Sequence, residues 1–250
     1  MRGRTLQHRW LCLWAIFLAV VLAGCASTSE SDTLVVFAAS SLTDVLPPIA
    51  ESYTLSTGTE VELSFAGSSA LREQILDGSP AGVFVSANPS IMAALATLGL
   101  IRLRIRPVAT NAIVSAVPID NPAQIADLES LAQDEPIVGL CAREVPCGQL
   151  STDVLTAAGV EAAVDTFEPR VWALVGQAVL EEVDAALVYD TDVIASGDLL
   201  ALGDPFLEAG STTYVAASVI GSTSDAERFV DFLTDALAQS ALQDAGFGSP

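Results

Sequence analysis

The sequence carries very little positive charge. It has no lysine, and its ten arginines face 31 aspartate and glutamate residues. Three of the arginines (Arg2, Arg4 and Arg9) and the single histidine, His8, lie within the first nine residues. Without that segment, seven positive charges oppose 31 negative ones, which gives a net charge of −24. Nucleic-acid binding is therefore not expected, because it depends on lysine and arginine to neutralise phosphates.

The lack of histidine beyond His8 also argues against several kinds of catalytic or metal site. A Ser-His-Asp or Cys-His nucleophile needs an imidazole base, and a zinc site would lack most of its usual ligands. The carboxylates show no D-x-D-x-D-G calcium spacing, and no glycine-rich phosphate loop follows a predicted strand. We expect no cofactor, no free metal cation and no enzymatic activity, and we attribute the acidity to a solvated surface.

The N-terminus has the pattern of a signal peptide, residues 1–24. Arginines precede an apolar run from Trp10 to Ala23, which is short for a membrane span. The run ends in LAGC, which resembles a bacterial lipoprotein cleavage box whose cysteine, Cys25, becomes lipidated; an ordinary signal with a chance cysteine is the alternative. Residues 25–32 are small and polar, as in a flexible tether. We expect an extracytoplasmic protein anchored to the cell membrane through Cys25.

Two cysteines remain in the part of the chain that should fold. They are Cys141 and Cys147, in the stretch CAREVPC. In an oxidising compartment, a disulfide that closes this short loop is the expected state. Two free thiols are the alternative.

Short apolar runs alternate with helix-like segments along the remaining chain. The predicted strands cover 33–38, 61–66, 82–87, 112–117, 136–140, 183–190 and 212–220. The predicted helices cover 41–53, 69–78, 89–99, 121–132, 147–159, 191–197 and 225–242. Continuously apolar strands between helices indicate an α/β fold with mainly parallel sheets, covered by helices on both faces. Ligands of such sheets bind at the carboxyl ends of the strands.

Two such strand ends carry almost the same sequence. FAASSL at 37–42 and FAGSSA at 65–70 repeat Phe-Ala-x-Ser-Ser at a spacing of 28 residues. Each stretch closes a predicted strand and opens a predicted helix, where free backbone N–H groups and the helix dipole favour an anion. Two such starts facing one cleft would hold a small anion without formal positive charge. The alternative is that each serine pair is an ordinary helix N-cap.

The chain resembles the substrate-binding proteins of molybdate ABC transporters over almost all of the sequence after the signal peptide. The resemblance lies in VVFAASSLTDVL, FAGSSALREQI, GSPAGVFVSANPSIMAAL, CAREVPCG and ALVYDTDV. It implies a two-lobe periplasmic-binding-protein fold of type II, in which two α/β lobes joined by two hinge crossings close over a tetrahedral oxyanion. The lobes would comprise 33–111 with 214–250, and 112–213.

The resemblance also implies which groups contact the ligand. They are the hydroxyls of Ser41, Ser68 and Tyr189 and the backbone N–H groups of Cys147 and Val171, with Ser40 and Ser69 as further candidates. Without the resemblance, Tyr189 would be interpreted as a core tyrosine and Val171 as ordinary core. A disulfide alone would explain Cys147.

Four features depart from the family pattern, and one of them is Gly82, where many relatives carry an acidic residue. Gly67 stands at the first place of the family's serine triplet and removes a hydroxyl there. Pro47 and Pro48 fall inside the first helix, so we expect a short turn from Ser41 and a second helix start at Pro47. Arg170 precedes Val171, and a turn of its side chain toward the cleft would favour a different oxyanion.

The resemblance implies a monomeric lipoprotein that captures molybdate, and also tungstate, and delivers it to the permease of an ABC transporter. A receptor for sulfate or another tetrahedral oxyanion is the alternative of the same class. A hydrolase that uses the serines as nucleophiles, with a carboxylate base, and a purely structural surface lipoprotein are the alternatives of other classes.

Overall fold

The computed structural model describes residues 33–205, 207 and 210–250. The predicted signal peptide (1–24), the lipidation site Cys25 and the tether (25–32) lie outside the described residues. The described residues belong to one structural unit, Thr33–Pro250. Within it, no helix is long and apolar enough to cross a membrane.

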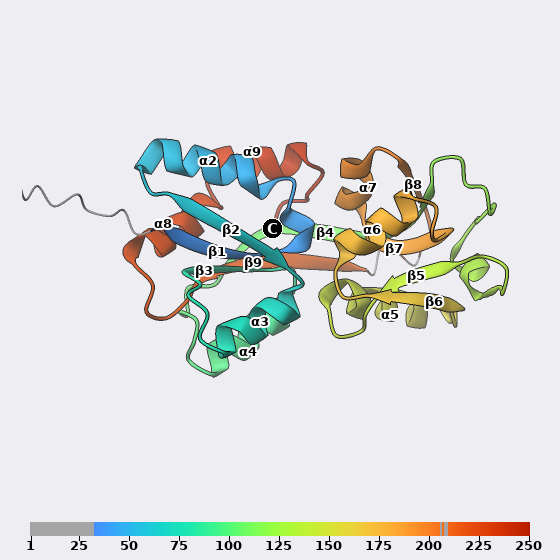
Figure 1. Cartoon of the computed structure of the whole chain (residues 1–250), viewed down its shortest axis with the longest axis horizontal. Helices are drawn as coiled ribbons and strands as arrows, with labels where there is room; N and C mark the ends of the chain where they lie inside the picture. Colours follow the sequence, from blue (N-terminus) through green and yellow to red (C-terminus); the bar gives the residue numbers. More distant parts are fainter. Residues whose placement is uncertain (1–32, 206, 208–209) are drawn as a thin grey trace, which may run out of the picture. The chain divides into compact units, whose positions relative to one another are not determined.

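Strands and helices alternate along most of this unit (Figure 1). The strands are β1 (Leu34–Ala39), β2 (Val61–Ala66), β3 (Val83–Ser86), β4 (Arg106–Pro118), β5 (Val138–Cys141), β6 (Val164–Glu168), β7 (Ala185–Tyr189), β8 (Leu199–Leu202) and β9 (Ser211–Ser218). The α-helices are α2 (Leu46–Thr57), α3 (Ser68–Leu76), α4 (Pro89–Thr97), α5 (Pro146–Ala158), α6 (Val171–Val179), α7 (Asp190–Ser196), α8 (Ser224–Phe232) and α9 (Ala236–Asp244). Two 3₁₀-helices are η1 (Ser40–Leu42) and η2 (Leu128–Ala132).

The strands form two groups that share β4. In the first group β1 pairs in parallel with β2 and β3, and β9 runs antiparallel to β3 and to the first part of β4. In the second group β5 pairs in parallel with β6 and β7, and the later part of β4 runs antiparallel to β7 and β8. Strand β4 changes partner between Ala112, opposite Ser211, and Ile113, opposite Tyr189. This arrangement confirms the predicted α/β fold.

Each group of strands has its own hydrophobic core. One core draws its buried residues from 113–207, and two adjoining clusters draw theirs from 34–109 and 214–247. In the first group, α2 and α9 cover one face of the sheet and α3 and α4 cover the other (Figure 1). Burial from both faces explains why β1 (LVVFAA) and β7 (AALVY) are apolar at nearly every position.

The predicted interruption of the first helix is confirmed. After β1 the chain forms η1, and α2 begins only at Leu46 with Pro47 and Pro48 in its first turn. Proline is tolerated there because the first N–H groups of a helix have no partner within the helix. The serines of the first repeat therefore lie on a short turn of their own, directly at the end of β1.

Two predicted helices are wrong in extent. In the segment 121–132 only Leu128–Ala132 is helical, because Asn121 and Gln124 have positive φ angles of 41° and 58°. The predicted terminal helix 225–242 is instead divided into α8 and α9. Helix α8 ends at Phe232, and Asp235, whose ψ is 159°, is the N-cap residue of α9. Between them, the Thr234 hydroxyl donates to the Asp231 carbonyl at 2.7 Å.

Two strands had no counterpart in the sequence prediction. Strand β6, VDTFE, alternates half-buried and exposed positions at the edge of the sheet, so it lacks the continuous apolar run of the central strands. Strand β8, LLAL, has only one fully buried residue and pairs with β4 alone. Both are edge strands, whose patterns are the weakest in sequence.

Candidate functional site

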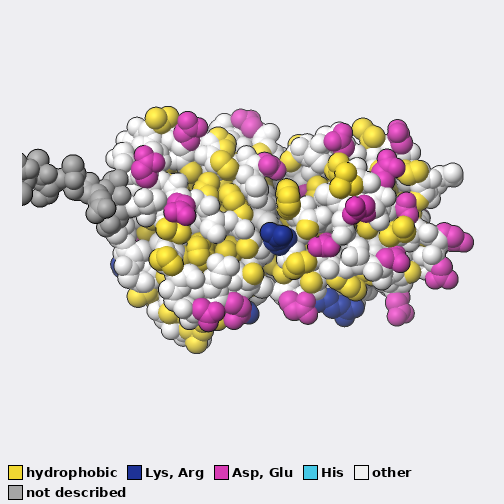
Figure 2. All heavy atoms as spheres, in the orientation of Figure 1, with side chains coloured by type: hydrophobic (Ala, Val, Ile, Leu, Met, Phe, Trp, Pro, Cys, Tyr) yellow, Lys and Arg dark blue, Asp and Glu magenta, His cyan; other side chains and the backbone are white. Residues whose placement is uncertain are grey.

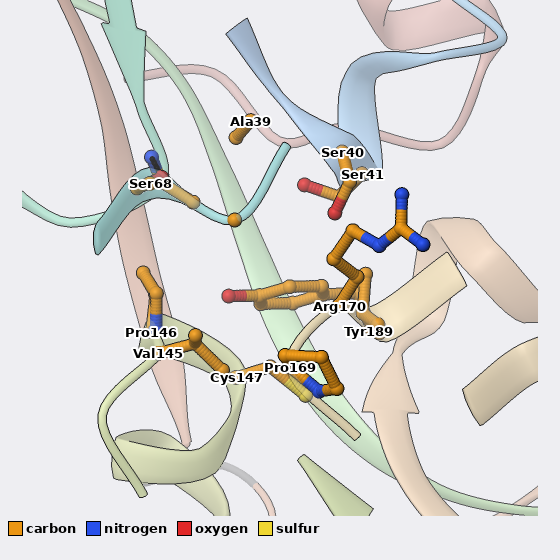
Figure 3. Close-up of a pocket in the computed structure, with 13 residues that line it drawn as sticks. Ala39, Ser40, Ser41, Ser68, Val145, Pro146, Cys147, Pro169, Arg170 and Tyr189 are labelled. Carbon is orange, nitrogen blue, oxygen red and sulfur yellow. Dashed lines mark hydrogen bonds between the residues drawn. The ribbon is translucent and has the colours of Figure 1, made fainter. Parts of the chain in front are cut away.

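A small pocket lies where the carboxyl ends of β1, β2 and β7 approach the N-termini of α5 and α6 (Figure 3). Its lining includes the five predicted contact residues and Ser40, that is Ser40, Ser41, Ser68, Cys147, Val171 and Tyr189. The part of the cavity that the centre of a water molecule could occupy has a volume of about 20 Å³. Sites for larger organic ligands are typically about 300–1,000 Å³, so this pocket suits a small ion.

The pairing register of β1 and β2 shows which serines of the two repeated stretches occupy equivalent positions after the strand ends. Phe37 and Phe65 match in the sequence repeat, but the strands pair Ala38 with Phe65 and Ala39 with Ala66. The structural register is thus one residue out of step with the repeat. The pairing ends at Ala39 and Ala66, so Ser41 and Ser68 are each the second residue beyond a paired strand end. This is the pair that the resemblance predicts, and both serines line the pocket.

Neither Ser41 nor Ser68 caps the helix to which it belongs. The N-cap residue of α3 is Gly67, and η1 follows Ala39, so neither position offers a side chain that bonds the helix. Ser68 is 1% exposed, and its Oγ accepts a hydrogen bond from the N–H of Ala87 at 3.1 Å. Its hydroxyl hydrogen remains available. The interpretation of the repeats as ordinary N-caps is therefore wrong.

A buried network orients Ser41 from behind. Its Oγ lies 2.7 Å from Oη of Tyr214. The Asn111 side-chain amide donates to Oη of Tyr214 at 3.4 Å and to Oγ1 of Thr191 at 2.7 Å. Since Tyr214 accepts from Asn111, it can donate its own hydrogen to Ser41, which leaves the Ser41 hydrogen for the pocket. Burial raises the pKa of Tyr214, so this hydroxyl keeps its proton.

Tyr189 is a buried hydroxyl without a hydrogen-bond partner. The residue is 1% exposed at the end of β7, and its Oη has no partner among the described residues. Its ring lies across the pocket with the hydroxyl at the pocket's centre (Figure 3). Burial raises the pKa of Tyr189 well above its usual value, and the neighbouring Tyr214 and Asp192 raise it further; the Tyr214 hydroxyl approaches Oη of Tyr189 but does not reach hydrogen-bond geometry. It is therefore a permanent donor. An unpartnered buried polar atom in a native fold calls for an explanation, and a ligand is one.

Two helix starts add backbone donors. Cys147 is the second residue of α5 and Val171 the first of α6, and both are buried. In the described part of the chain, neither backbone N–H has a hydrogen-bond acceptor. Helix N-termini of this kind attract anions. Cys147 is also joined to Cys141 by a disulfide that closes the loop before α5, with 5.7 Å between the Cα atoms.

Gly67 has a steric reason to be glycine. A Cβ at this position would lie 2.9 Å from the carbonyl oxygen of Pro169 and 3.4 Å from Cγ1 of Val145. Both neighbours line the same pocket from the opposite strand group. The missing hydroxyl of the family's serine triplet is thus the consequence of a close approach between the two halves.

Further bonds join the two halves beside the pocket. The Ser69 hydroxyl donates to the carbonyl of Glu144, and Asn88 Nδ2 donates to Gln149 Oε1 at 3.0 Å. Ser69, one of the two further candidates, therefore does not line the pocket, whereas Ser40 does. The reason is local: successive residues of a helix point in different directions, so only Ser68 of α3 faces inward.

The pocket is almost free of charge. Its one charged lining residue is Arg170, the exposed N-cap residue of α6. The carboxylates lie elsewhere, and Figure 2 shows acidic side chains scattered over both halves with basic atoms near the middle of the face. One acidic group acts on the site from behind Tyr189, namely Asp192. Its carboxylate accepts from the Tyr189 N–H at 3.3 Å, and burial raises its pKa to about 7, opposed by that hydrogen bond.

These groups can bind an anion but cannot activate a nucleophile. The pocket presents hydroxyl and backbone donors, while Ser41 bonds to a tyrosine and Ser68 accepts from a backbone N–H. Neither serine has a carboxylate partner to act as a base. Among the described residues, no group of three or more His, Cys, Asp or Glu side chains is placed to hold a metal ion.

Comparison with known proteins identifies the family. Residues 34–248 match the family described as bacterial extracellular solute-binding proteins. The chain belongs to this family. As a solute-binding protein it is not an enzyme, and the family's extracellular location agrees with the extracytoplasmic location predicted from the sequence.

Several relatives of this solute-binding protein are molybdate-binding proteins. The one from Mycobacterium tuberculosis is 29% identical over 97% of this chain and 100% of its own length. The one from Haemophilus influenzae is 28% identical over 95% of this chain and 98% of its own. The resemblance predicted from the sequence is thereby confirmed.

Solved structures show the same two-lobe fold. The periplasmic molybdate-binding protein of Azotobacter vinelandii has a TM-score of 0.75 at 20% identity, over 87% of this chain and 99% of its own. The sulfate-binding protein of M. tuberculosis has a TM-score of 0.73 at 16% identity, over 86% of both chains. At these identities the likeness concerns the fold alone.

Proposed function

We propose that the protein is a receptor for molybdate, and for tungstate, that captures the oxyanion between its two lobes and delivers it to the permease of an ABC transporter. It does so as a monomer held at the cell membrane through a lipid on Cys25, and it uses no cofactor. The M. tuberculosis and H. influenzae relatives, which bind molybdate, support the choice of ligand.

The observation that carries the proposal is the unpartnered hydroxyl of Tyr189 inside a pocket of donors. A tetrahedral dianion would accept from this hydroxyl, from Ser41 and Ser68, and from the N–H groups of Cys147 and Val171. Hydrogen bonds to a charged group contribute about 1.5–3 kcal/mol each. Several of them would offset the cost of desolvating the anion and leave an affinity in the micromolar range or better, about −8 kcal/mol.

Sulfate is the second candidate ligand. The donors named above serve any tetrahedral dianion, and a sulfate-binding protein shares the fold. Molybdate and tungstate have longer metal–oxygen bonds than the sulfur–oxygen bonds of sulfate. Donors fixed by buried hydrogen bonds, as Ser68 and Ser41 are, would therefore discriminate between the anions by size.

Isothermal titration calorimetry of the purified protein tests the proposal. We expect saturable binding of molybdate and tungstate and much weaker binding of sulfate. Trp172 fluorescence is a second readout, because it is the only tryptophan beyond the signal peptide. Trp172 lies next to Val171 but outside the pocket and is 60% exposed, so calorimetry is the primary measurement. Tight sulfate binding with weak molybdate binding would favour the second candidate, and no oxyanion binding below millimolar concentration would refute both.

A further inference from the structure

One side chain that lines the pocket is charged, unlike the hydroxyl and backbone N–H donors described above. Arg170 is exposed, lines the pocket, and extends beside Ser40 and Ser41 (Figure 3). It is the residue directly before α6, and α6 packs against η1, which carries both serines. A guanidinium stays protonated at every physiological pH. Arg170 thus places a full positive charge at the mouth of a pocket whose other lining residues are neutral.

Arg170 is also unpaired in a chain rich in carboxylates. Arg72, Arg102, Arg104, Arg106 and Arg228 each form an ion pair with an aspartate or glutamate. Among the described residues, the Arg170 side chain has neither an ion pair nor a hydrogen bond.

The nearest acidic residue in sequence does not hold Arg170. Glu168 Oε1 accepts instead from Gln177 Nε2 at 2.8 Å. No protein group therefore competes with an incoming anion for this guanidinium, and no partner fixes the side chain away from the pocket.

We propose that Arg170 is a specificity-determining residue that makes the site prefer a doubly charged oxyanion to a singly charged one of the same shape. The inference rests on the function proposed above, because it takes the pocket as the oxyanion site. The uncharged donors recognise shape and the positions of the oxygens. Arg170 responds to total charge, since Coulomb attraction to a dianion is twice that to a monoanion at the same distance.

Affinities for two anions of similar shape but different charge can separate the contribution of shape from that of charge. Molybdate and perrhenate are both tetrahedral MO₄ ions of similar size, but molybdate carries two negative charges and perrhenate one. For a charge at the protein surface several ångströms from the ligand, we expect an effect of about 3- to 10-fold in affinity per unit of ligand charge. Loss of Arg170 should therefore weaken molybdate binding by about 10- to 100-fold and perrhenate binding by only about 3- to 10-fold.

The chain offers a matched control in Arg143. It is likewise exposed and, in the described part of the chain, unpaired, but it lines a different cavity, between α5 and the β5–β6 edge. Arg143→Gln changes the net charge as Arg170→Gln does, without touching the pocket. Arg170→Lys keeps the charge and removes the guanidinium geometry. Thermal unfolding of each variant without ligand verifies that it is folded.

The experiment measures calorimetric affinities for molybdate and perrhenate in the purified wild-type protein and these three variants. We expect the preference for molybdate over perrhenate to fall about 3- to 10-fold in Arg170→Gln, and to stay near the wild-type value in Arg170→Lys and Arg143→Gln. The molybdate affinity of Arg170→Gln should also depend less on salt concentration. Equal losses for both anions, or equal effects of Arg143→Gln and Arg170→Gln, would overturn the inference while leaving the proposed function intact. A wild-type protein that binds no oxyanion would overturn both.

Discussion

Removal of the Tyr189 hydroxyl should change ligand affinity and protein stability in opposite directions. Tyr189→Phe deletes a buried oxygen that has no hydrogen-bond partner within the described residues. It keeps the aromatic ring, whose centroid lies 6.2 Å from the ring centroid of Tyr214. A buried polar group without a partner costs about 1–3 kcal/mol. We therefore expect the free energy of unfolding without ligand to stay unchanged or to rise by about 1 kcal/mol.

The same substitution should weaken oxyanion binding. A hydrogen bond to a charged acceptor contributes about 1.5–3 kcal/mol, which corresponds to about a 10- to 100-fold loss of affinity for molybdate. Urea denaturation of the ligand-free protein measures the first quantity, and isothermal titration calorimetry measures the second. The opposite signs exclude a general disruption of the fold as the cause of weaker binding.

Tyr214→Phe is the matched control for this prediction. Its hydroxyl has two partners, Ser41 at 2.7 Å and Asn111 at 3.4 Å, so its removal should lower the free energy of unfolding by about 1 kcal/mol. A Tyr189→Phe variant that is destabilised as much as Tyr214→Phe and keeps the wild-type affinity would contradict this prediction. The Tyr189 hydroxyl would then serve the fold and not the ligand.

Two further predictions concern the serines and the carboxylate behind Tyr189. The double substitution Ser41→Ala with Ser68→Ala should weaken molybdate binding by at least about 10-fold. It should lower the free energy of unfolding by only about 1–2 kcal/mol, since neither serine caps a helix. Losses of equal size in the free energies of binding and of unfolding, measured by calorimetry and denaturation, would show that these serines have a structural role. Burial raises the pKa of Asp192 from 3.8 to about 7, so between about pH 4 and 7 the folded protein holds a proton that the unfolded chain releases. The preference of the folded protein for the protonated Asp192 carboxyl therefore stabilises the fold at low pH, and this contribution to the free energy of unfolding is lost as the pH rises through 7. Asp192→Asn should therefore show a smaller fall in the free energy of unfolding between pH 4.5 and 7.5 than the wild type does, and parallel pH profiles would contradict the assignment.

The sequence was sufficient for those parts of the molecule where one local signal decides the structure. The apolar runs of β1 and β7 and the prolines at the start of α2 are such signals, because continuous burial and a missing N–H act within a few residues. The segment 121–127 carries apolar residues at helical spacing, but positive φ angles at Asn121 and Gln124 prevent a helix there. Backbone choices of this kind depend on the surrounding fold and leave little trace in composition.

The candidate site, too, could be predicted from the sequence only in part. The repeated Phe-Ala-x-Ser-Ser stretches pointed to two strand ends, but only the register of β1 and β2 shows that Ser41 and Ser68 occupy equivalent positions, two residues beyond the paired ends. Two residues behind the site, Tyr214 and Asn111, gave no signal in the sequence. They belong to strands β9 and β4, which approach the pocket only where the chain crosses between the two sheets, whereas Asp192 follows Tyr189 by three residues and its role shows only in its bond to the Tyr189 N–H. The requirement for glycine at position 67 likewise depends on Pro169, which is distant in sequence.

The most direct test of the central claim is a crystal structure of the protein grown with molybdate, with anomalous diffraction data collected at the molybdenum absorption edge. We expect a single strong molybdenum peak within the pocket, with oxyanion oxygens in hydrogen-bond range of the Ser41, Ser68 and Tyr189 hydroxyls and of the Cys147 and Val171 N–H groups. A molybdenum peak outside this pocket, or a pocket that stays free of molybdenum at saturating molybdate, would contradict the account.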